Sequence, residues 1–144
     1  MARPKKLKVV TSDPKNFQRQ HKGDAGFDLR LQQDVTLIPG QVSELIGTGV
    51  RVQIPENCVG LVMPRSSLGK RGITLANNVG VIDSGYRGEI KIMLVSYGKQ
   101  QTLFAGERVA QLLIVPLQPV EVEFVDELEE SDRGVGGFGS TGKF

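Results

Sequence analysis

Short stretches in which every second residue is apolar recur along this sequence and limit the folds open to it. The pattern occurs in residues 50–54 (VRVQI), 89–94 (EIKIML) and 120–124 (VEVEF). Because successive side chains of a β-strand point to opposite faces of the sheet, each stretch predicts a half-buried strand. The uninterrupted apolar run at 112–115 (LLIV) predicts a strand buried on both faces.

Helical periodicity is nearly absent from the chain. No window of about 11 residues shows a strong 3.6-residue apolar period, and the one helix we expect is short, near residues 66–71 after Pro64. Turn-forming pairs such as Pro39-Gly40 and Ser84-Gly85 separate the apolar runs. The sequence therefore predicts an all-β fold with little helix, a jelly-roll-like β-barrel or sandwich.

Residue counts exclude several kinds of site. The chain has 144 residues, which suits one domain, with one cysteine and one histidine. Cys58 alone excludes a disulfide framework and a multi-thiolate zinc site. A Ser-His-Asp or Cys-His nucleophilic site is disfavoured, because its base would have to be His21. No apolar stretch is long enough to span a membrane and MARPKKLKVV lacks an apolar signal core, so we expect a cytoplasmic protein without a membrane partner.

Charge is segregated between the two ends. Residues 1–22 contain seven Lys/Arg and one acid, whereas residues 121–132 contain seven acids and no base. The basic end has no interleaved aromatics or binding motif, so no direct nucleic-acid binding is expected. We expect residues 1–127 to form the β-domain and the acidic, then glycine-rich residues 128–144 to form a flexible C-terminal arm, because this segment cannot bury enough apolar surface to fold alone.

The arm carries groups that suit a nucleotide. Arg133 offers a guanidinium, Ser140 and Thr141 offer hydroxyls, and the glycines free backbone amides for an anion. Phe138 is suited to stack on a base. The alternative is a plain flexible tail, although a tail that only dangles needs no aromatic residue.

Two internal segments offer further candidates. In residues 64–69 (PRSSLG), Arg65 stands before two hydroxyls at a possible helix start, which suits an anion or an ordinary helix cap. Asp83 follows an apolar run, so it should lie at a strand end or hairpin tip beside an aromatic residue. With histidine scarce, this carboxylate is the natural group to orient and deprotonate a water, unless it only forms a turn.

Two polar residues interrupt apolar segments. Asp28 lies within residues 25–29 (AGFDL), where it would help to hold a hydrated Mg²⁺ or serve as a structural hydrogen-bond acceptor. Gln111 precedes the apolar run 112–115, so its side chain needs a partner from the chain or from a ligand. The residues alone thus indicate a small all-β binder of nucleotides or phosphate esters.

In order along the chain, these segments resemble the five motifs of the homotrimeric deoxyuridine triphosphatase (dUTPase) family. The matching segments are 25–29, 64–69, 77–89, 106–111 and 133–142. The resemblance implies a jelly-roll trimer with shared active sites that hydrolyses dUTP to dUMP and pyrophosphate. The resemblance further implies that water attacks the α-phosphorus, with Mg²⁺ as the cofactor on the triphosphate. By the same resemblance, the activity would limit uracil incorporation into DNA and supply dUMP for dTMP synthesis.

The resemblance also implies a role for each matching residue. Asp83 would activate the water and hold the 3′-hydroxyl, and Tyr86 would pack under the deoxyribose and leave no room for a 2′-hydroxyl. Asp28 would act on the metal through water. The implied substrate-binding residues are Arg65, Ser66, Ser67, Asn77, Gly80, Tyr86, Lys91, Gln111, Arg133, Phe138, Gly139, Ser140 and Thr141. Among them, Asn77 and the backbone around Lys91 would read the uracil edge, and the arm would reach a neighbour's site.

Two alternatives stand beside this reading. A dCTP deaminase shares the fold but needs a carboxylate placed to act on the base, and residues 83–86 resemble the phosphatase version instead. A nucleotide-sensing trimer that regulates a partner protein would bind the nucleotide without turning it over.

Overall fold

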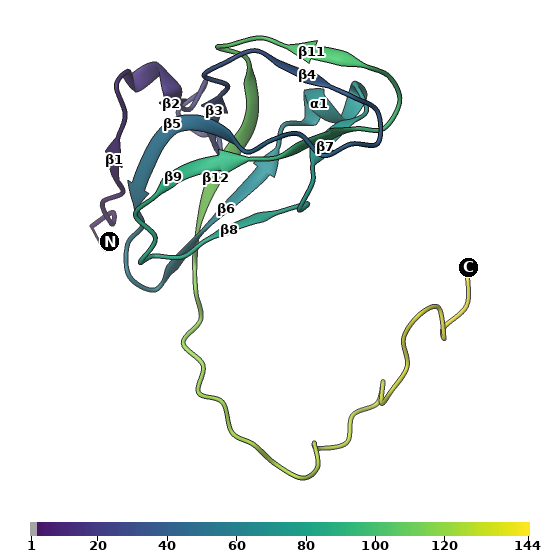
Figure 1. Ribbon diagram of the computed structural model, residues 1–144. Helices are drawn as coiled ribbons and strands as arrows, with labels where there is room; N and C mark the ends of the chain where they lie inside the picture. Colours follow the sequence, from purple (N-terminus) through teal and green to yellow (C-terminus); the bar gives the residue numbers. More distant parts are fainter. Residues whose placement is uncertain (1–2) are drawn as a thin grey trace.

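The computed structural model describes residues 3–144, and its regular structure is almost entirely β (Figure 1). The strands are β1 (Lys8–Val10), β2 (Phe17–Gln18), β3 (Phe27–Arg30), β4 (Val35–Leu37), β5 (Ile46–Gln53), β6 (Cys58–Pro64), β7 (Ile73–Leu75), β8 (Gly80–Ile82), β9 (Glu89–Ile92), β10 (Leu94–Ser96), β11 (Gln101–Leu103) and β12 (Arg108–Pro116). The helical elements are a 3₁₀ turn, η1 (Pro14–Asn16), and a short helix, α1 (Ser66–Lys70). The predicted all-β, jelly-roll-like fold with little helix is confirmed.

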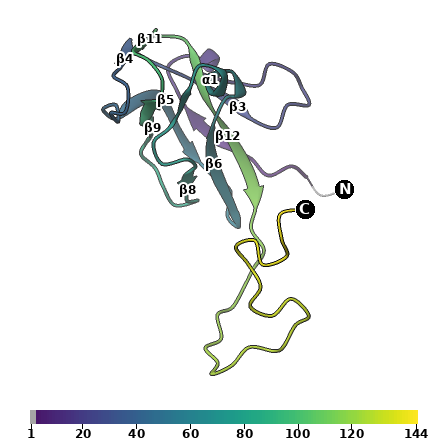
Figure 2. The same ribbon diagram turned by 90° about the vertical axis from the view of Figure 1, so that its right-hand side faces the viewer.

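Antiparallel pairing organises the strands into four sheets. The largest has the order β2-β3-β12-β6-β8, and a second has the order β1-β5-β9. Two smaller pairs, β10-β7 and β11-β4, complete the set in the described part of the chain. In Figures 1 and 2, β5 and β9 lie on one side of the barrel, while β6 and β12 lie on the other.

The core lies between these sheets and follows from the alternation in the sequence. In β5 the buried positions are Ile46, Thr48, Val50 and Val52, and the residues between them are half-buried or exposed. The neighbouring strand β9 buries Ile90 and Ile92, and β12 of the largest sheet buries Leu112 in the same core. Full burial of one such aliphatic side chain contributes about 1.5–3 kcal/mol, so the period-2 pattern determines which face of each strand turns inward.

The predicted short helix is confirmed as α1. Arg65 precedes it in an extended conformation and makes no side-chain capping hydrogen bond. Leu68 is the buried residue that attaches this helix to the core. The hydroxyl of Ser66 therefore does not serve as the ordinary helix cap that the sequence left open.

Two strand predictions need correction. Residues 120–124 form no strand, and Val120, Val122 and Phe124 are 83%, 73% and 95% exposed. The reason is that β12 ends at Pro116 and the chain then leaves the barrel, so no strand among residues 3–144 supplies hydrogen bonds to this segment (Figure 1). Residues 112–115 do form a strand, as part of β12, but burial on both faces is wrong: only Leu112 is fully buried, and the three residues after it are partly exposed.

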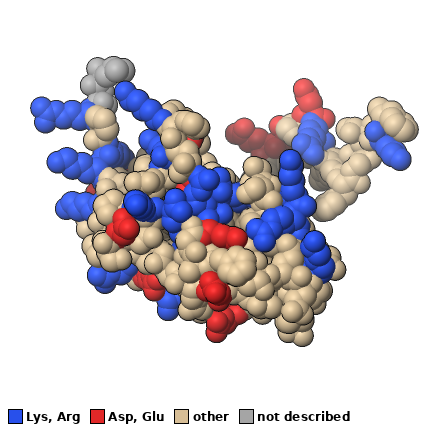
Figure 3. Space-filling model, turned by 90° about the horizontal axis from the view of Figure 1, so that it is seen from above, with Lys and Arg blue, Asp and Glu red and all other residues tan. Residues whose placement is uncertain are grey.

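Residues 117–144 contain no helix or strand and extend away from the barrel. The predicted boundary between a β-domain that ends at residue 127 and an arm that begins at residue 128 stays a prediction. Figure 3 shows the segregated charge, with basic side chains around the N-terminal segment and acidic side chains on the arm. Among residues 3–144, no helix has the length and apolar character needed to cross a membrane.

Candidate active site

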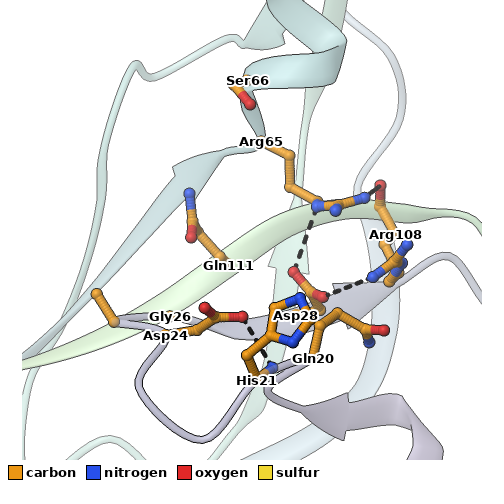
Figure 4. A pocket seen from close by; sticks show the side chains of 10 residues that line it. Gln20, His21, Asp24, Gly26, Asp28, Arg65, Ser66, Arg108 and Gln111 are labelled. Carbon is orange, nitrogen blue, oxygen red and sulfur yellow. Dashed lines mark hydrogen bonds and ion pairs between the residues drawn. The ribbon is translucent and has the colours of Figure 1, made fainter.

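A cavity of about 540 Å³ opens beside β3, β12 and the beginning of α1 (Figure 4). We call it the anion cavity because arginine, hydroxyl and amide groups line it. Its lining residues are Gln20, His21, Asp24, Ala25, Gly26, Asp28, Arg65, Ser66, Arg108 and Gln111. Four of the predicted site residues, Asp28, Arg65, Ser66 and Gln111, are therefore brought together here.

Strand register explains how distant segments meet in this cavity. Asp28 on β3 pairs directly with Gln111 on β12, so their side chains stand side by side on one face. On the other side of β12, Ala110 pairs with Pro64, the last residue of β6, which places Arg65 at the same end. Three predicted motifs thus converge because β12 lies between β3 and β6.

Arg108 also lines the anion cavity, and the sequence reading missed it. Arg108 and Gln111 are three residues apart, so strict alternation would send their side chains to opposite faces. The β3–β12 pairing shifts register between Arg108 and Ala110, and this extra residue brings both side chains to the same cavity. The sequence did contain one signal for Arg108: it lies in the segment 106–111, which was already singled out as a candidate for the site.

Asp28 holds two arginines in place. Its Oδ1 lies 3.3 Å from Nε of Arg65, and its Oδ2 accepts a hydrogen bond from Nη1 of Arg108 at 3.1 Å. Nη1 of Arg65 also donates to the backbone carbonyl of Arg108 at 3.4 Å. Both oxygens of this nearly buried carboxylate are therefore engaged, and the two guanidiniums are fixed at the cavity wall.

Gln111 and Gly26 determine the shape of the cavity floor. Nε2 of Gln111 donates to the carbonyl of Pro64 at 3.3 Å, which answers the need for a partner noted from the sequence. A Cβ on Gly26 would lie 3.0 Å from Cβ and 3.1 Å from Cδ of Gln111 and would overlap its Oε1 atom. Gly26 therefore leaves the space that the Gln111 amide occupies.

A second cavity, of about 310 Å³, contains the predicted catalytic carboxylate. Its lining residues are Leu45, Val81, Ile82, Asp83, Tyr86, Glu89, Ile90 and Lys91. Asp83 directly follows β8, and its carbonyl accepts a hydrogen bond from the backbone N–H of Tyr86 at 3.1 Å. The prediction that Asp83 lies at a strand end beside an aromatic residue is confirmed. We call this the Asp83 cavity.

The two cavities share no lining residue and lie far apart within one chain. Ile82 pairs with Gly60 on the antiparallel strand β6, so the next residue, Asp83, lies opposite Val59. From there to Arg65 the extended chain runs six residues, which is about 20 Å. One copy of the chain therefore does not place Asp83 next to its own arginines.

The remaining predicted residues lie outside both cavities. Gly80 is the first residue of β8, at the opposite end of that strand from Asp83, and Asn77 lies in the turn before it. Ser67 is exposed on α1. In the arm, Nε of Arg133 donates to the carbonyl of Gly136 at 2.9 Å, and Phe138 is exposed. Gly139, Ser140 and Thr141 are likewise exposed.

Comparison with known proteins assigns the chain to a family. A family model described as dUTPase matches residues 13–142, which span both cavities and most of the arm. The chain belongs to the dUTPase family. The deoxyuridine 5'-triphosphate nucleotidohydrolase of Clostridium tetani is 44% identical over 140 residues, covering 96% of each protein. The protein of the same name from Cutibacterium acnes is 47% identical over 123 residues, covering 83% of this chain and 80% of that protein.

Solved structures of dUTPases have the same fold. A dUTPase mutant of Staphylococcus bacteriophage 80alpha with dUpNHpp has a TM-score of 0.82 at 30% identity, covering 97% of this chain and 100% of that chain. A mutant dUTPase from phage phi11 of S. aureus, described with a structural Mg(II) ion, has a TM-score of 0.75 at 28% identity. That comparison covers 88% of this chain and 100% of the phage chain.

The donor groups of this chain limit how a dUTPase metal could be bound. Among residues 3–144, no group of three or more His, Cys, Asp or Glu side chains could hold a metal ion. Both Asp28 oxygens already face guanidiniums, so this carboxylate is suited to a metal only through an intervening water. Such a donor set fits Mg²⁺ that takes its direct ligands from phosphates and water.

Proposed function

We propose that this protein hydrolyses dUTP to dUMP and pyrophosphate, with the triphosphate in the anion cavity and the attacking water at Asp83. The observation that carries the proposal is the sorting of the predicted residues into two cavities of different chemistry. One presents guanidinium, hydroxyl and amide groups, and the other presents a carboxylate beside a tyrosine. Through this reaction the protein would limit uracil incorporation into DNA and supply dUMP for dTMP synthesis.

The anion cavity supplies the groups that bind phosphate oxygens. Arg65 and Arg108 are oriented by Asp28, so they keep their geometry as negative charge develops on the leaving pyrophosphate. Ser66 and Gln111 add a hydroxyl and an amide to the same wall. The preorganised guanidiniums stabilise the charge of the transition state at little reorganisation cost.

The formal charges of the anion cavity cancel, which argues for cations from elsewhere. Two arginines stand against Asp24 and Asp28, so the sum is zero with His21 neutral. A triphosphate therefore needs further positive charge. We propose that dUTP arrives as its magnesium complex; Asp28 would contact that metal through its hydration shell, and the ion would supply positive charge to the phosphate oxygens. Arg133 of an arm would add a second charge.

Asp83 is the proposed general base. Its carboxylate accepts a proton from the water that attacks the α-phosphorus, and pyrophosphate leaves on the opposite side. A positioned base contributes about 10²–10⁴-fold to the rate. Tyr86 packs under the deoxyribose on the same turn, while Lys91 and the backbone of β9 border the base. Asn77, in the turn before β8, and Gly80, its first residue, would complete the set that reads uracil.

The separation of the two cavities supports a homotrimer with shared active sites. About 20 Å of strand lies between Asp83 and Arg65, so we propose that the Asp83 cavity of one copy serves the anion cavity of another. The exposed segment 120–124 supports the same conclusion, because its alternating residues suit a strand that pairs with a neighbouring copy.

We propose that residues 128–144 form the arm that closes a site on another copy. There Phe138 would stack on uracil, and Arg133, Gly139, Ser140 and Thr141 would reach the phosphates together with Ser67. The support for this proposal is that the arm residues named here are exposed on a segment without regular structure, and that Ser67 is exposed on α1. Residues 1–127 then form the β-domain that carries the two cavities.

The test is pyrophosphate release, with Mg²⁺ present, from dUTP, dCTP, dTTP and UTP in parallel. Fast release from dUTP alone is expected, and chelation of Mg²⁺ with EDTA should slow it. Release of ammonia from dCTP would indicate the deaminase chemistry of the same fold instead. Binding of dUTP without release from any nucleotide would make the protein a nucleotide-sensing binder.

A further inference from the structure

Tyr86 lies so close to Gly88 that a side chain at position 88 would displace it. A Cβ atom built on Gly88 would lie 2.5 Å from Oη of Tyr86, 2.7 Å from its Cζ and 3.1 Å from its Cε2. Non-bonded carbon atoms have their optimal separation at about 3.5–4.0 Å. An alanine here would therefore force the tyrosine ring to move.

One hydrogen bond holds the outer end of this ring. The hydroxyl of Tyr86 donates to the backbone carbonyl of Glu89 at 2.9 Å, across the position where a side chain of residue 88 would stand. Tyr86 as a residue is 44% exposed, so packing holds its ring on one side only. Tyr86 can thus reach the Glu89 carbonyl only because residue 88 has no Cβ atom.

We propose that Gly88 is a positioning residue for sugar selection: it holds the Tyr86 ring where that ring excludes a 2′-hydroxyl. The inference rests on the proposed function, in which Tyr86 packs under the deoxyribose. A ring that hinges away from Glu89 opens the space beside C2′ and loses its contact with the sugar. A ribonucleotide then gains access while dUTP loses a binding surface.

Gly85 provides a matched control in the same turn. A Cβ on Gly85 would meet no atom within 4 Å, and neither Gly85 nor Gly88 has a positive φ. Alanine at either position removes the same backbone freedom from the unfolded chain. Only alanine at position 88 collides with Tyr86, so the difference between the two variants isolates that contact.

The first measurement compares kcat/KM for dUTP and UTP in the wild type, Gly88→Ala and Gly85→Ala. We expect Gly88→Ala to lower the preference for dUTP about tenfold, near the lower end of what one small group contributes to discrimination. Gly85→Ala should stay within about twofold of the wild type. Since Tyr86 faces the sugar and not the reacting phosphorus, KM for dUTP should rise more than kcat falls.

A second measurement follows the ring without using activity. The chain has two tyrosines and no tryptophan, and Tyr97 is 72% exposed. In a Tyr97→Phe background, Tyr86 is therefore the sole source of tyrosine emission. Adding Gly88→Ala to this background should change the emission, and adding Gly85→Ala should leave it unchanged.

A double-mutant cycle guards against a trivial folding defect. Once Tyr86→Ala has removed the ring, adding Gly88→Ala should not change the dUTP-to-UTP ratio further. An additional loss in the double variant would show that Gly88 acts on the loop and would overturn the proposal. So would a wild-type ratio in Gly88→Ala. If the wild type releases no pyrophosphate from dUTP, the proposed function itself fails.

Discussion

Replacing Asp28 by asparagine tests the idea that one carboxylate holds both arginines of the anion cavity. The substitution keeps the size of the side chain but removes its charge. Oδ1 and Oδ2 now lie 3.3 Å from Nε of Arg65 and 3.1 Å from Nη1 of Arg108. An asparagine amide keeps one acceptor and turns the other atom into a donor, which would face a guanidinium that has only donors.

The stability that Asp28→Asn should lose lies between the value for breaking an exposed ion pair and the value for breaking a buried one. The side chains of Asp28, Arg65 and Arg108 are 12%, 27% and 30% exposed. An exposed pair contributes about 0–1 kcal/mol, and breaking a fully buried pair costs about 3–5 kcal/mol. The asparagine loses one contact with an arginine, and its amide N–H faces a guanidinium that also only donates. Together these two effects should lower the free energy of unfolding by about 2 kcal/mol. For a chain of this length that is a fall in Tm of about 7 °C.

Thermal unfolding at one fixed protein concentration measures this cost, because assembly makes Tm depend on concentration. The matched control is Asp24→Asn. Asp24 lines the same cavity, but its Oδ2 accepts from the backbone N–H of His21 at 3.0 Å, a bond that asparagine can also accept. Both variants change the charge of the cavity equally. Equal Tm values for Asp28→Asn and Asp24→Asn would refute the reasoning.

Three further changes test other parts of the site. Asp83→Asn should bind dUTP nearly as the wild type does while kcat falls about 100-fold or more, since only the base is lost; stopped turnover with equilibrium binding checks this. Truncation after residue 132 should leave a folded assembly, seen by circular dichroism and light scattering, with little activity, because the arm adds nothing to the core; an unfolded product would make the arm structural. Gly26→Ala should push Gln111 off the Pro64 carbonyl and raise KM for dUTP about fivefold, the contribution of one hydrogen bond. Gly23→Ala meets no atom within 4 Å and is its control in the same steady-state assay.

The strands could be predicted from sequence wherever the chain supplies its own partner. Residues 50–54 alternate and lie mainly in β5, between β1 and β9. Residues 120–124 alternate just as regularly but remain outside any sheet, because alternation records which face can be buried and not which strand is available to pair. Composition could not distinguish these two cases.

The site was predicted in its parts but not in its arrangement. Asp28, Arg65 and Gln111 were named from residue type, and the register of β12 explains why they meet. Arg108 was missed because the direction of its side chain depends on a register shift between β3 and β12, which alternation along a single strand does not predict. The distance between Asp83 and the arginines depends on strand order, which hydrophobic periodicity does not contain.

The separation of Asp83 from Arg65 along β6 and β8 has a genetic consequence. If each active site takes its base from one copy and its arginines from another, two differently damaged alleles can complement each other. A chain lacking Asp83 still offers an intact anion cavity, and a chain lacking Arg65 still offers an intact base. Mixed assemblies of these two inactive chains would then contain some working sites. Co-expression of the two variants would therefore restore part of the activity that each variant lacks alone.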